Sequence, residues 1–307
     1  MINNLLNRQQ LAHNKELYER YGIKRSIFRP IGSHDFANTD QLAADKPWLD
    51  QENALDRLQT HPDFGGFSEE WQEQLRGFVK NGYMVLRNFY SPQEVDQLNT
   101  AVDQLLRDAQ TGFNYTGRKI MDAHLQSELI DKQYFRNEAL LRLLNFAMGR
   151  QVVPFQTINF LEGSEQKAHS DSIHMSTAPE GYLIAAWTAL EDIHEGNGPL
   201  FYFPGSHRMP YVTCQDYASG NTRWLLGHES YKRYEDKIEA IVEEQKLSKE
   251  FFRGQKGDVF IWHANLLHGG APIRQEGSTR KSMVAHYFCE DVICYHEISQ
   301  RPALLKR

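Results

Sequence analysis

The sequence predicts a mainly β fold with flanking helices, of which the simplest form is a jelly roll. From about residue 152 the chain consists of short apolar runs bounded by Gly, Pro and Asn, a pattern typical of the strands of a sandwich or barrel. These runs are "VVPFQTINFL", "YLIAAWTAL", "PLFYFPG", "GDVFIW" and "RKSMVAHYF". The chain has 307 residues, 40% of them hydrophobic, so it is long enough to bury a full core.

The first ordered elements are a helix, a strand and a second helix. Ser68 is a good N-cap, apolar residues follow it at helical spacing, and Asn81-Gly82 is a stop signal. The run "YMVLRNF" predicts a strand, and Ser91-Pro92 opens another helix that continues to about residue 107. We therefore expect flanking helices before the β region begins.

Two segments lie outside the strand pattern. Residues 1–66 are polar and irregular, and we expect an N-terminal arm packed on the core. Residues 67–307 then form one domain with an insertion at about 211–256, whose stretch "YEDKIEAIVEEQKLSKEFF" has helical periodicity. Such an insertion is typical of a lid, an oligomer contact or a plain solvated helix. Its side chains that could face a substrate are Tyr211, Tyr217, Arg223, Trp224, Tyr231 and Tyr234.

Composition narrows the range of partners. The 34 basic residues are fewer than the 40 acidic ones, and a net charge of -6 makes nucleic acid an unfavourable partner. The N-terminus lacks the apolar core of a secretion signal, and no window has the roughly 20 apolar residues of a membrane span. We therefore expect a cytoplasmic protein that acts on a small molecule, and a homodimer only on base rates.

A candidate metal site begins in the run "AHSDSIHMS". In an extended chain alternate side chains share a face, so His169 and Asp171 can reach one cation. The third donor has to come from another strand, and His268 in "WHANLLHGG" is the candidate. Two histidines and one carboxylate suit non-haem Fe(II), whereas zinc enzymes use similar donors. The spacing alone therefore leaves the metal open.

A second candidate site follows in the next strand. Arg280 and Ser282 in "RKS" alternate onto one face, and the guanidinium fork can bind a carboxylate through two hydrogen bonds. A buried arginine needs a negative partner, which is either an internal Asp or Glu or an anionic ligand. Taken by itself, the pair fits a structural ion pair as well as a ligand site.

Together these motifs resemble the phytanoyl-CoA dioxygenase-like family of Fe(II)- and 2-oxoglutarate-dependent oxygenases. The resemblance covers most of residues 67–288 and includes, in order, "FVKNGYMVLRNFYSPQEVDQL", "HSD", "WTALED", "NGPLFYFPGSH", "GDVFIWHANLLHGG" and "RKS". It implies a double-stranded β-helix, the cupin-like form of the jelly roll, in which Fe(II) is bound by His169, Asp171 and His268. It further implies oxidation with O2, decarboxylation of 2-oxoglutarate to succinate and CO2, and hydroxylation of a substrate C–H bond.

The resemblance also implies roles for residues around the metal. Arg280 and Ser282 would hold the distal carboxylate of 2-oxoglutarate, with Asn159 and Trp187 beside them as cosubstrate contacts or as core residues. The carboxylate of Asp171 favours hydroxylation over halogenation, because related halogenases carry a small residue there.

Four further histidines are surplus to a complete triad. His207 is expected in a structural turn, His174 near the substrate, and His263 and His286 in the core or at the rim.

Two other functions remain open from the sequence. A zinc or other metal enzyme on the same fold would use the same donors but would leave Arg280 and Ser282 without a joint role. A non-catalytic binding module would have no reason to keep the complete triad. The substrate is undefined, and we expect residues 1–66 and 211–256 to select it, with Arg223, Lys232 and Arg233 suiting an anionic or ring-bearing molecule.

Overall fold

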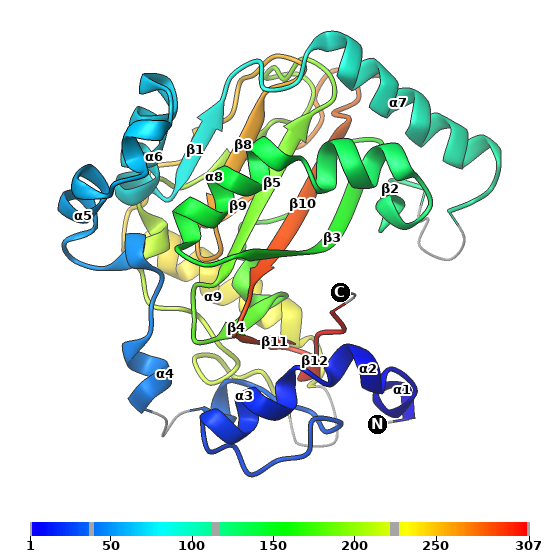
Figure 1. Ribbon diagram of the computed structural model, residues 1–307. Helices are drawn as coiled ribbons and strands as arrows, with labels where there is room; N and C mark the ends of the chain where they lie inside the picture. Colours follow the sequence, from blue (N-terminus) through cyan, green and yellow to red (C-terminus); the bar gives the residue numbers. More distant parts are fainter. Residues whose placement is uncertain (1, 37–39, 112–116, 222–226, 306–307) are drawn as a thin grey trace.

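The computed structural model describes residues 2–36, 40–111, 117–221 and 227–305 and is built around a six-stranded antiparallel sheet (Figure 1). In spatial order the strands are β1 (Tyr83–Leu86), β8 (Val259–His263), β5 (Leu183–Ala189), β10 (Ser282–Cys289), β3 (Val152–Phe160) and β2 (Lys119–Met121). The strand β10 lies between β3 and β5, which precede it by more than ninety residues, so the order requires long crossovers. Such crossovers are the mark of a jelly roll.

Two three-stranded sheets complete the β framework. One has the order β7 (Glu250–Phe251), β6 (Leu200–Tyr202), β9 (His268–Gly270), and the other has the order β12 (Arg301–Pro302), β11 (Ile293–His296), β4 (Ser176–Ala178). All the strand pairs are antiparallel. The predicted fold class, a mainly β jelly-roll core with flanking helices, is confirmed.

Three helices cover one face of the large sheet: α6 (Glu69–Asn81), α7 (Pro92–Arg107) and α8 (Glu138–Met148). The capping residues are those the sequence indicated. The Ser68 hydroxyl accepts a hydrogen bond from the Trp71 amide at 3.2 Å, and Gly82 ends α6 with a φ of 81°. Ser91 and Glu94 form a capping box at the start of α7. Local signals therefore fixed both helices as predicted.

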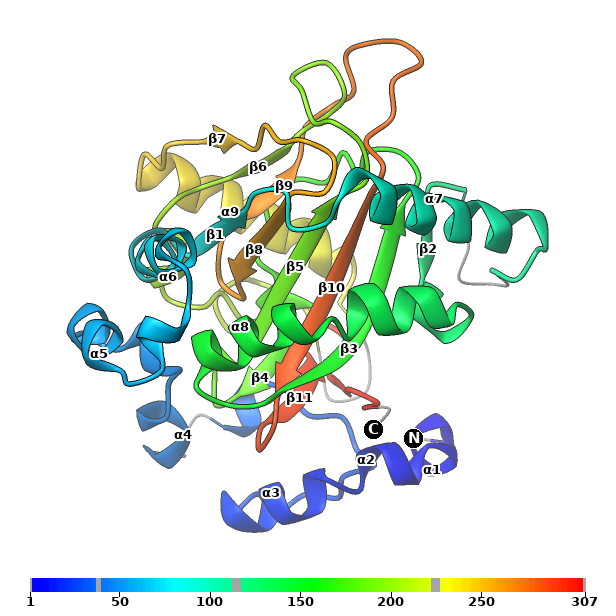
Figure 2. The same cartoon turned by 45° about the horizontal axis from the view of Figure 1, so that its top comes forward.

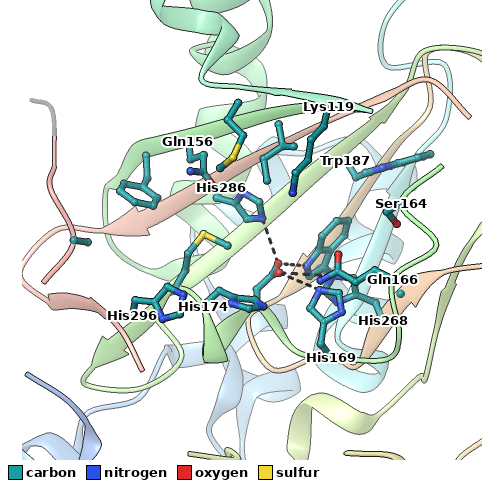
Figure 3. A pocket seen from close by; sticks show the side chains of 18 of the residues that line it. Lys119, Gln156, Ser164, Gln166, His169, His174, Trp187, His268, His286 and His296 are labelled. Carbon is teal, nitrogen blue, oxygen red and sulfur yellow. Dashed lines mark hydrogen bonds and ion pairs between the residues drawn. The ribbon is translucent and has the colours of Figure 1, made fainter. Parts of the chain in front are cut away.

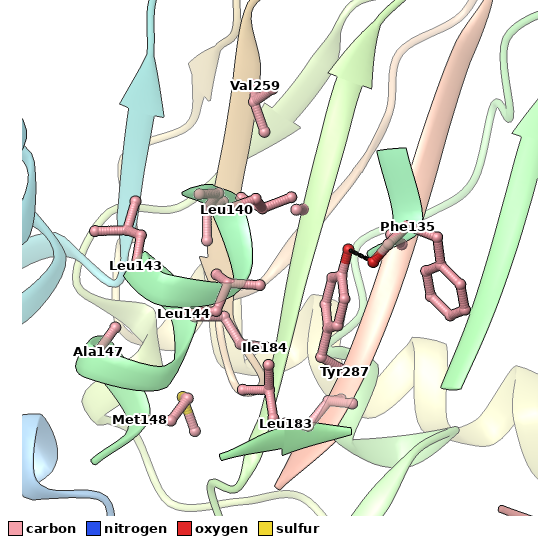
Figure 4. Packing of buried hydrophobic residues seen from close by; sticks show 14 of the residues in the cluster. Phe135, Leu140, Leu143, Leu144, Ala147, Met148, Leu183, Ile184, Val259 and Tyr287 are labelled. Carbon is pink, nitrogen blue, oxygen red and sulfur yellow. Dashed lines mark hydrogen bonds between the residues drawn. The ribbon is translucent and has the colours of Figure 1, made fainter. Parts of the chain in front are cut away.

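The main core lies between these helices and the large sheet (Figure 4). Leu140, Leu143 and Leu144 of α8 belong to this cluster together with Ile184 of β5 and Val259 of β8, and Tyr287 of β10 donates a hydrogen bond to the Phe135 carbonyl at 2.9 Å. Met283 of β10 belongs to this cluster as well. Because side chains alternate along a strand, Val284 and His286 of β10 face the other side of the sheet, where the cavity lies.

The remaining helices lie toward the chain ends and on the other side of the molecule. They are α1 (Ile2–Leu6), α2 (Arg8–Leu11), α3 (Asn14–Arg20), α4 (Asp40–Ala44), α5 (Ala54–Thr60) and α9 (Ser230–Glu244). Short helical turns are η1 (Ser33–Asp35), η2 (Trp48–Asp50), η3 (Phe64–Gly66), η5 (Ala123–Leu125), η6 (Ile130–Phe135), η7 (Asp171–Ile173) and η8 (Ser206–Arg208). Within the described ranges, no helix has the length and apolar character that a bilayer crossing requires.

The first residues of the chain pack on the strands near its end. Leu17, Tyr18 and Ile31 form a buried cluster with Ile293 and Tyr295 of β11, and α3 runs past the β4–β11 pair in both views (Figure 2). The N-terminal segment therefore supports the small sheet that carries the C-terminal strands.

Candidate metal centre and its cavity

The structure brings the three predicted metal donors together (Figure 3). His169 and His268 form an isolated antiparallel bridge, with reciprocal backbone hydrogen bonds of 2.9 Å, and Asp171 begins η7. The Nε2 atoms of His169 and His268 lie 4.0 and 3.7 Å from Oδ1 of Asp171. One ligand atom from each residue falls within 4.8 Å of the other two. The extended run predicted for this motif stops at Asp171, because a helical turn follows.

Both imidazole rings are held with Nε2 toward the shared centre. His169 Nδ1 is 2.8 Å from the Lys167 carbonyl, and His268 Nδ1 is 2.9 Å from the Leu266 carbonyl. A carbonyl only accepts, so each Nδ1 carries a proton, and in the neutral ring Nε2 keeps a free lone pair. Backbone atoms thus orient Nε2 of both rings toward the shared centre.

The two oxygens of Asp171 have different surroundings. Oδ1 faces the two histidine donors, whereas Oδ2 accepts a 2.7 Å hydrogen bond from the Trp262 indole. His286 Nε2 approaches the same Oδ2 at 3.5 Å. His286 is buried, as expected for a core residue, and it also lies beside the triad and lines the cavity. One oxygen is held in place and the other is free to bind a cation.

Replacing Trp262 with phenylalanine is expected to weaken metal binding by about 10- to 100-fold. Loss of an outer-shell hydrogen bond that orients a metal ligand typically lowers the metal affinity by that factor. Anaerobic titration of the metal-free protein with Fe(II) or Co(II) measures the effect. Trp187→Phe is the matched control, since Trp187 lines the same cavity without touching Asp171. Equal metal affinities in the two variants would contradict the assigned role.

Burial and neighbouring side chains set the protonation of His169 and Asp171. Burial lowers the pKa of His169 to about 4, with His268 adding to the effect. Burial by itself would raise the pKa of Asp171, but His268 and His286 outweigh it and hold that pKa well below its usual range. At neutral pH the centre therefore offers an unprotonated imidazole and a carboxylate, which are the forms that bind metal.

The buried histidines make the stability of the metal-free protein depend on pH. Burial lowers the pKa of His169 to about 4 and those of His174 and His207 to about 3, from 6.5. The unfolded chain takes up these protons first, so stability is complete above pH 6.5 and is lost as the pH falls toward 3. We expect a slope of up to about 1.4 kcal/mol per pH unit for each histidine. Urea unfolding at pH values from about 6.5 to 4.5 measures it, and a flat profile would contradict it.

Arg280 lies in the same cavity as a buried cation without an acidic partner. It is 1% exposed, and the described residues include no carboxylate within ion-pair distance of it. Its terminal nitrogens lie 3.2 Å from Ser164 Oγ and 3.4 Å from Ser282 Oγ, and Nε has no hydrogen-bond partner. Burial lowers the pKa of Arg280 to about 10, which still leaves it charged at neutral pH. The structural ion pair considered from the sequence is therefore not formed.

The other predicted cosubstrate residues, Trp187, Ser282 and Asn159, differ in their position relative to the cavity. The guanidinium of Arg280 lies 5.5 Å from the ring centroid of Trp187 and 5.8 Å from that of Phe160. Ser282 is fully buried and reaches the cavity only through its contact with Arg280. Asn159 does not line the cavity. Its neighbours Ile158 and Phe160 do, so strand alternation turns the Asn159 side chain toward the opposite face. The buried amide of Asn159 has no hydrogen-bond partner among the described residues, and its role as a cosubstrate contact stays a prediction.

The cavity around these groups has a volume of about 600 Å³ and two ends. Trp187 and Ser164 lie on one side of the triad, and His174 and His296 lie on the other (Figure 3). The lining residues are Lys119, Met121, Phe155, Gln156, Ile158, Phe160, Ser164, Gln166, His169, Asp171, His174, Met175, Trp187, Leu200, Tyr231, Trp262, His268, Gly269, Arg280, His286, Phe288, Tyr295, His296, Ser299, Arg301, Pro302 and Ala303. The expected position of His174 near a substrate agrees with this lining.

The segments expected to select the substrate contribute little to the described lining. No residue of 1–66 lines the cavity, and Tyr231 alone does so from the described part of 211–256. Tyr234 instead accepts a hydrogen bond from the Ser170 amide at 3.0 Å, between two metal-donor candidates. Arg223 and Trp224 lie outside the described residues. The missed residues run from Tyr295 to Ala303, and no motif marks them because their position depends on strand pairing.

The surplus histidines away from the cavity have structural contacts. His263 Nε2 lies 2.9 Å from Asp50 of the N-terminal segment, and His263 Nδ1 accepts from the Asn265 amide at 3.0 Å. His207 is packed against Gly82, where an added Cβ would lie 2.5 Å from the ring. Both rings therefore tie turns together at a distance from the metal centre.

Comparison with known proteins gives a family and a set of related folds. The family profile described as phytanoyl-CoA dioxygenase (PhyH) matches residues 78–282. Peroxisomal phytanoyl-CoA dioxygenase of Rattus norvegicus is 24% identical over 247 residues, covering 71% of this chain and 68% of that protein. Ectoine dioxygenase of Sphingopyxis alaskensis is 28% identical over 219 residues, covering 64% and 69% respectively.

Solved structures share the fold. The S. alaskensis EctD crystal structure with 2-oxoglutarate and 5-hydroxyectoine aligns with a TM-score of 0.60 at 22% identity, covering 78% of this chain and 84% of that one. The alpha ketoglutarate dependent carbocyclase SnoK from nogalamycin biosynthesis aligns with a TM-score of 0.59 at 16% identity, covering 75% and 87%. Since the profile spans two thirds of the sequence, the chain belongs to the phytanoyl-CoA dioxygenase family, as its motifs predicted.

Proposed function

We propose that this iron- and 2-oxoglutarate-dependent dioxygenase hydroxylates a C–H bond of a small anionic molecule. The observation that supports it most is the buried Arg280 cation, which forms no ion pair with a described acidic residue and shares a cavity with two imidazoles and a carboxylate. A divalent metal and a dicarboxylate together satisfy both halves of this arrangement.

The donor set fits Fe(II). His169 and His268 present neutral Nε2 atoms, and Asp171 presents Oδ1 while its other oxygen is held by Trp262. Two imidazoles and a single carboxylate oxygen leave coordination positions open for other ligands. When bound, iron and 2-oxoglutarate would supply the electrons that activate O2, and O2 would be the oxidant for attack on a C–H bond. The chain's own residues fix the donors, exclude water and orient the substrate.

The far end of the cavity fits the distal carboxylate of 2-oxoglutarate. The Arg280 fork is flanked by the rings of Trp187 and Phe160, and the hydroxyls of Ser164 and Ser282 lie against its terminal nitrogens. An incoming carboxylate would gain two charge-assisted hydrogen bonds from a group that is already desolvated. A zinc enzyme using the same three donors would leave Arg280 without an anionic partner, which favours the oxygenase.

An anionic substrate follows from the charges in the cavity. Among the described lining residues, the permanent cations are Lys119, Arg280 and Arg301, and the one acid is Asp171, so the formal charge is +2. Fe(II) and the dianion of 2-oxoglutarate cancel each other, so this excess remains after both are bound. A substrate carrying negative charge would compensate it, whereas a cationic substrate would be repelled.

Anaerobic titration with Fe(II) and then 2-oxoglutarate tests the cofactor assignment. We expect a weak visible absorption band once both are present, and succinate formation after oxygen is admitted. Iron binding without a band, or binding of zinc alone, would overturn the assignment.

The reaction type needs its own test, because the SnoK structure shows that this fold also serves a carbocyclase. Mass spectrometry of products from a panel of small carboxylates and phosphates measures it. A product that gains one oxygen atom supports hydroxylation, and a rearranged product of unchanged oxygen content would refute it.

A further inference from the structure

The cavity end away from Arg280 is built largely by the last strands of the chain. Six residues of this segment line it: Tyr295, His296, Ser299, Arg301, Pro302 and Ala303. The match to the family profile ends at residue 282, and these residues follow that match.

The segment is a hairpin whose strand β11 is paired on both sides, with β4 and with β12. Ile293–His296 (β11) pairs with β4 through the register Tyr295↔Ser176, and Arg301 returns opposite His296. The Ala303 amide donates to the Cys294 carbonyl at 2.8 Å, and Gln300 makes the turn with a φ of 52°. Because the strand pairing fixes the backbone, His296 and Arg301 line the cavity from a fixed hairpin, and Arg301 is also exposed to solvent.

The N-terminal segment supports the hairpin from outside. The Glu297 carboxylate accepts from the Ser33 amide at 3.0 Å and from the Ser33 hydroxyl at 2.6 Å, and it is 3% exposed. The Ile31 amide donates to the Gln300 carbonyl at 2.9 Å. Residues 1–66 thus act on this end of the cavity by supporting its wall, without lining it.

The polar groups at this end are hydrogen-bond donors. His296 Nδ1 accepts from the Ser299 amide at 3.2 Å, so the neutral ring carries its proton on Nε2. The Tyr231 hydroxyl accepts from Gln166 at 3.2 Å and keeps its own proton to donate. Within the described part of the chain, Arg301 has no ion-pair partner. Among the described residues no carboxylate lines this end, so these donors suit a ligand that supplies acceptors.

This set of donors lies close to the metal centre. The His174 ring centroid is 6.0 Å from that of His169, 5.0 Å from Tyr231 and 5.4 Å from His296. Met175, Phe155 and Phe288 add apolar surface to the same lining. A ligand that reaches from the hairpin to the triad therefore combines an anionic head with an apolar body.

We propose that the β11–β12 hairpin is the substrate-recognition wall, with Arg301 and His296 binding the carboxylate or phosphate group of a small amphiphilic substrate. The proposal rests on the proposed function and names the part of the site that chooses the substrate. The apolar body would lie along Met175, Phe155 and Phe288, with one of its C–H bonds toward the triad.

Direct binding measurements test the wall independently of turnover. The probes are hexanoate and hexyl phosphate, with hexanol as the uncharged counterpart, added anaerobically to protein loaded with Fe(II) and 2-oxoglutarate and followed by calorimetry. We expect the two anions to bind the wild type more tightly than hexanol does, and Arg301→Gln to weaken the anions by about tenfold or more. Hexanol binding should not change, and Arg301→Lys should recover part of the loss.

The control is Arg274→Gln, which removes an exposed arginine outside the cavity lining and should bind as the wild type does. Undiminished anion binding by Arg301→Gln, or hexanol binding as tight as hexanoate in the wild type, would overturn the proposal. If the 2-oxoglutarate band fails to form, the probes are added to the Fe(II)-loaded protein. An Arg301-dependent preference for anions would then still support the wall while the proposed function itself failed.

Discussion

Asp171→Ala is expected to abolish metal binding and 2-oxoglutarate decarboxylation. Asp171 supplies the one acidic side chain among the described cavity residues, so its loss leaves neutral imidazoles surrounded by the cations Lys119, Arg280 and Arg301. A divalent cation then meets net repulsion in place of a compensating charge. Because outer-shell residues alone contribute about 10- to 100-fold to metal affinity, losing this ligand should cost more than about a hundredfold. Anaerobic Fe(II) titration and succinate formation measure the two losses.

The variant should still fold, because Asp171 makes its contacts at the cavity and not in the helix-covered core. Circular dichroism and thermal unfolding check this. Glu195→Ala is the control, since Glu195 forms only an exposed pair with Arg253. If Asp171→Ala bound Fe(II) with the affinity of the control, the assigned metal centre would be wrong.

The sequence predicted the parts of the site whose function is encoded locally. His169 and Asp171 lie two residues apart, as do Arg280 and Ser282, and such spacings survive folding because neighbouring residues share one stretch of backbone. The helix caps at Ser68 and Ser91 are local in the same sense, and the structure forms both. The third metal donor had to come from another strand. His268 was the candidate, and the order of the motifs in the family supported it.

Two placements depend on the face to which a strand residue points. Ser282 and His286 are four residues apart in β10, so alternation places them on one face, and His286 belongs with the cavity. The same rule separates Asn159 from Ile158 and Phe160. Both outcomes were available from the sequence once a single residue of each strand had been assigned to a face.

The C-terminal wall was not available in this way. Its position depends on β11 pairing with β4, across more than a hundred residues of sequence, and on support from Ser33 and Ile31 at the other end of the chain. No local pattern in "ICYHEISQRPA" distinguishes a cavity wall from an ordinary hairpin. The large insertion drew attention because of its aromatic residues, but its described part sends only Tyr231 into the cavity.

Arg280 allows the cosubstrate assignment to be tested through two properties that should change in opposite directions. Arg280→Met removes the fork that would bind the distal carboxylate, so the Kd and KM for 2-oxoglutarate should rise by about tenfold to a hundredfold. The affinity for Fe(II) should be unchanged, because Arg280 does not touch the triad. Arg280→Lys keeps the charge without the fork, so its Kd and KM for 2-oxoglutarate should lie between those of the wild type and of Arg280→Met. Titration of the Fe(II)-loaded protein with 2-oxoglutarate gives these values.

Whereas Arg280→Met should bind 2-oxoglutarate more weakly, its ligand-free form should be at least as stable to unfolding as the wild type. A structural ion pair that loses its arginine leaves a buried carboxylate exposed to apolar surroundings and costs about 3–5 kcal/mol. Arg280 has no such partner among the described residues, and its desolvated charge is a cost that the folded protein bears until an anion arrives. Arg280→Met should therefore unfold in urea at the wild-type concentration or above it. Strong destabilisation together with an unchanged 2-oxoglutarate affinity would show that Arg280 serves the fold and not the cosubstrate.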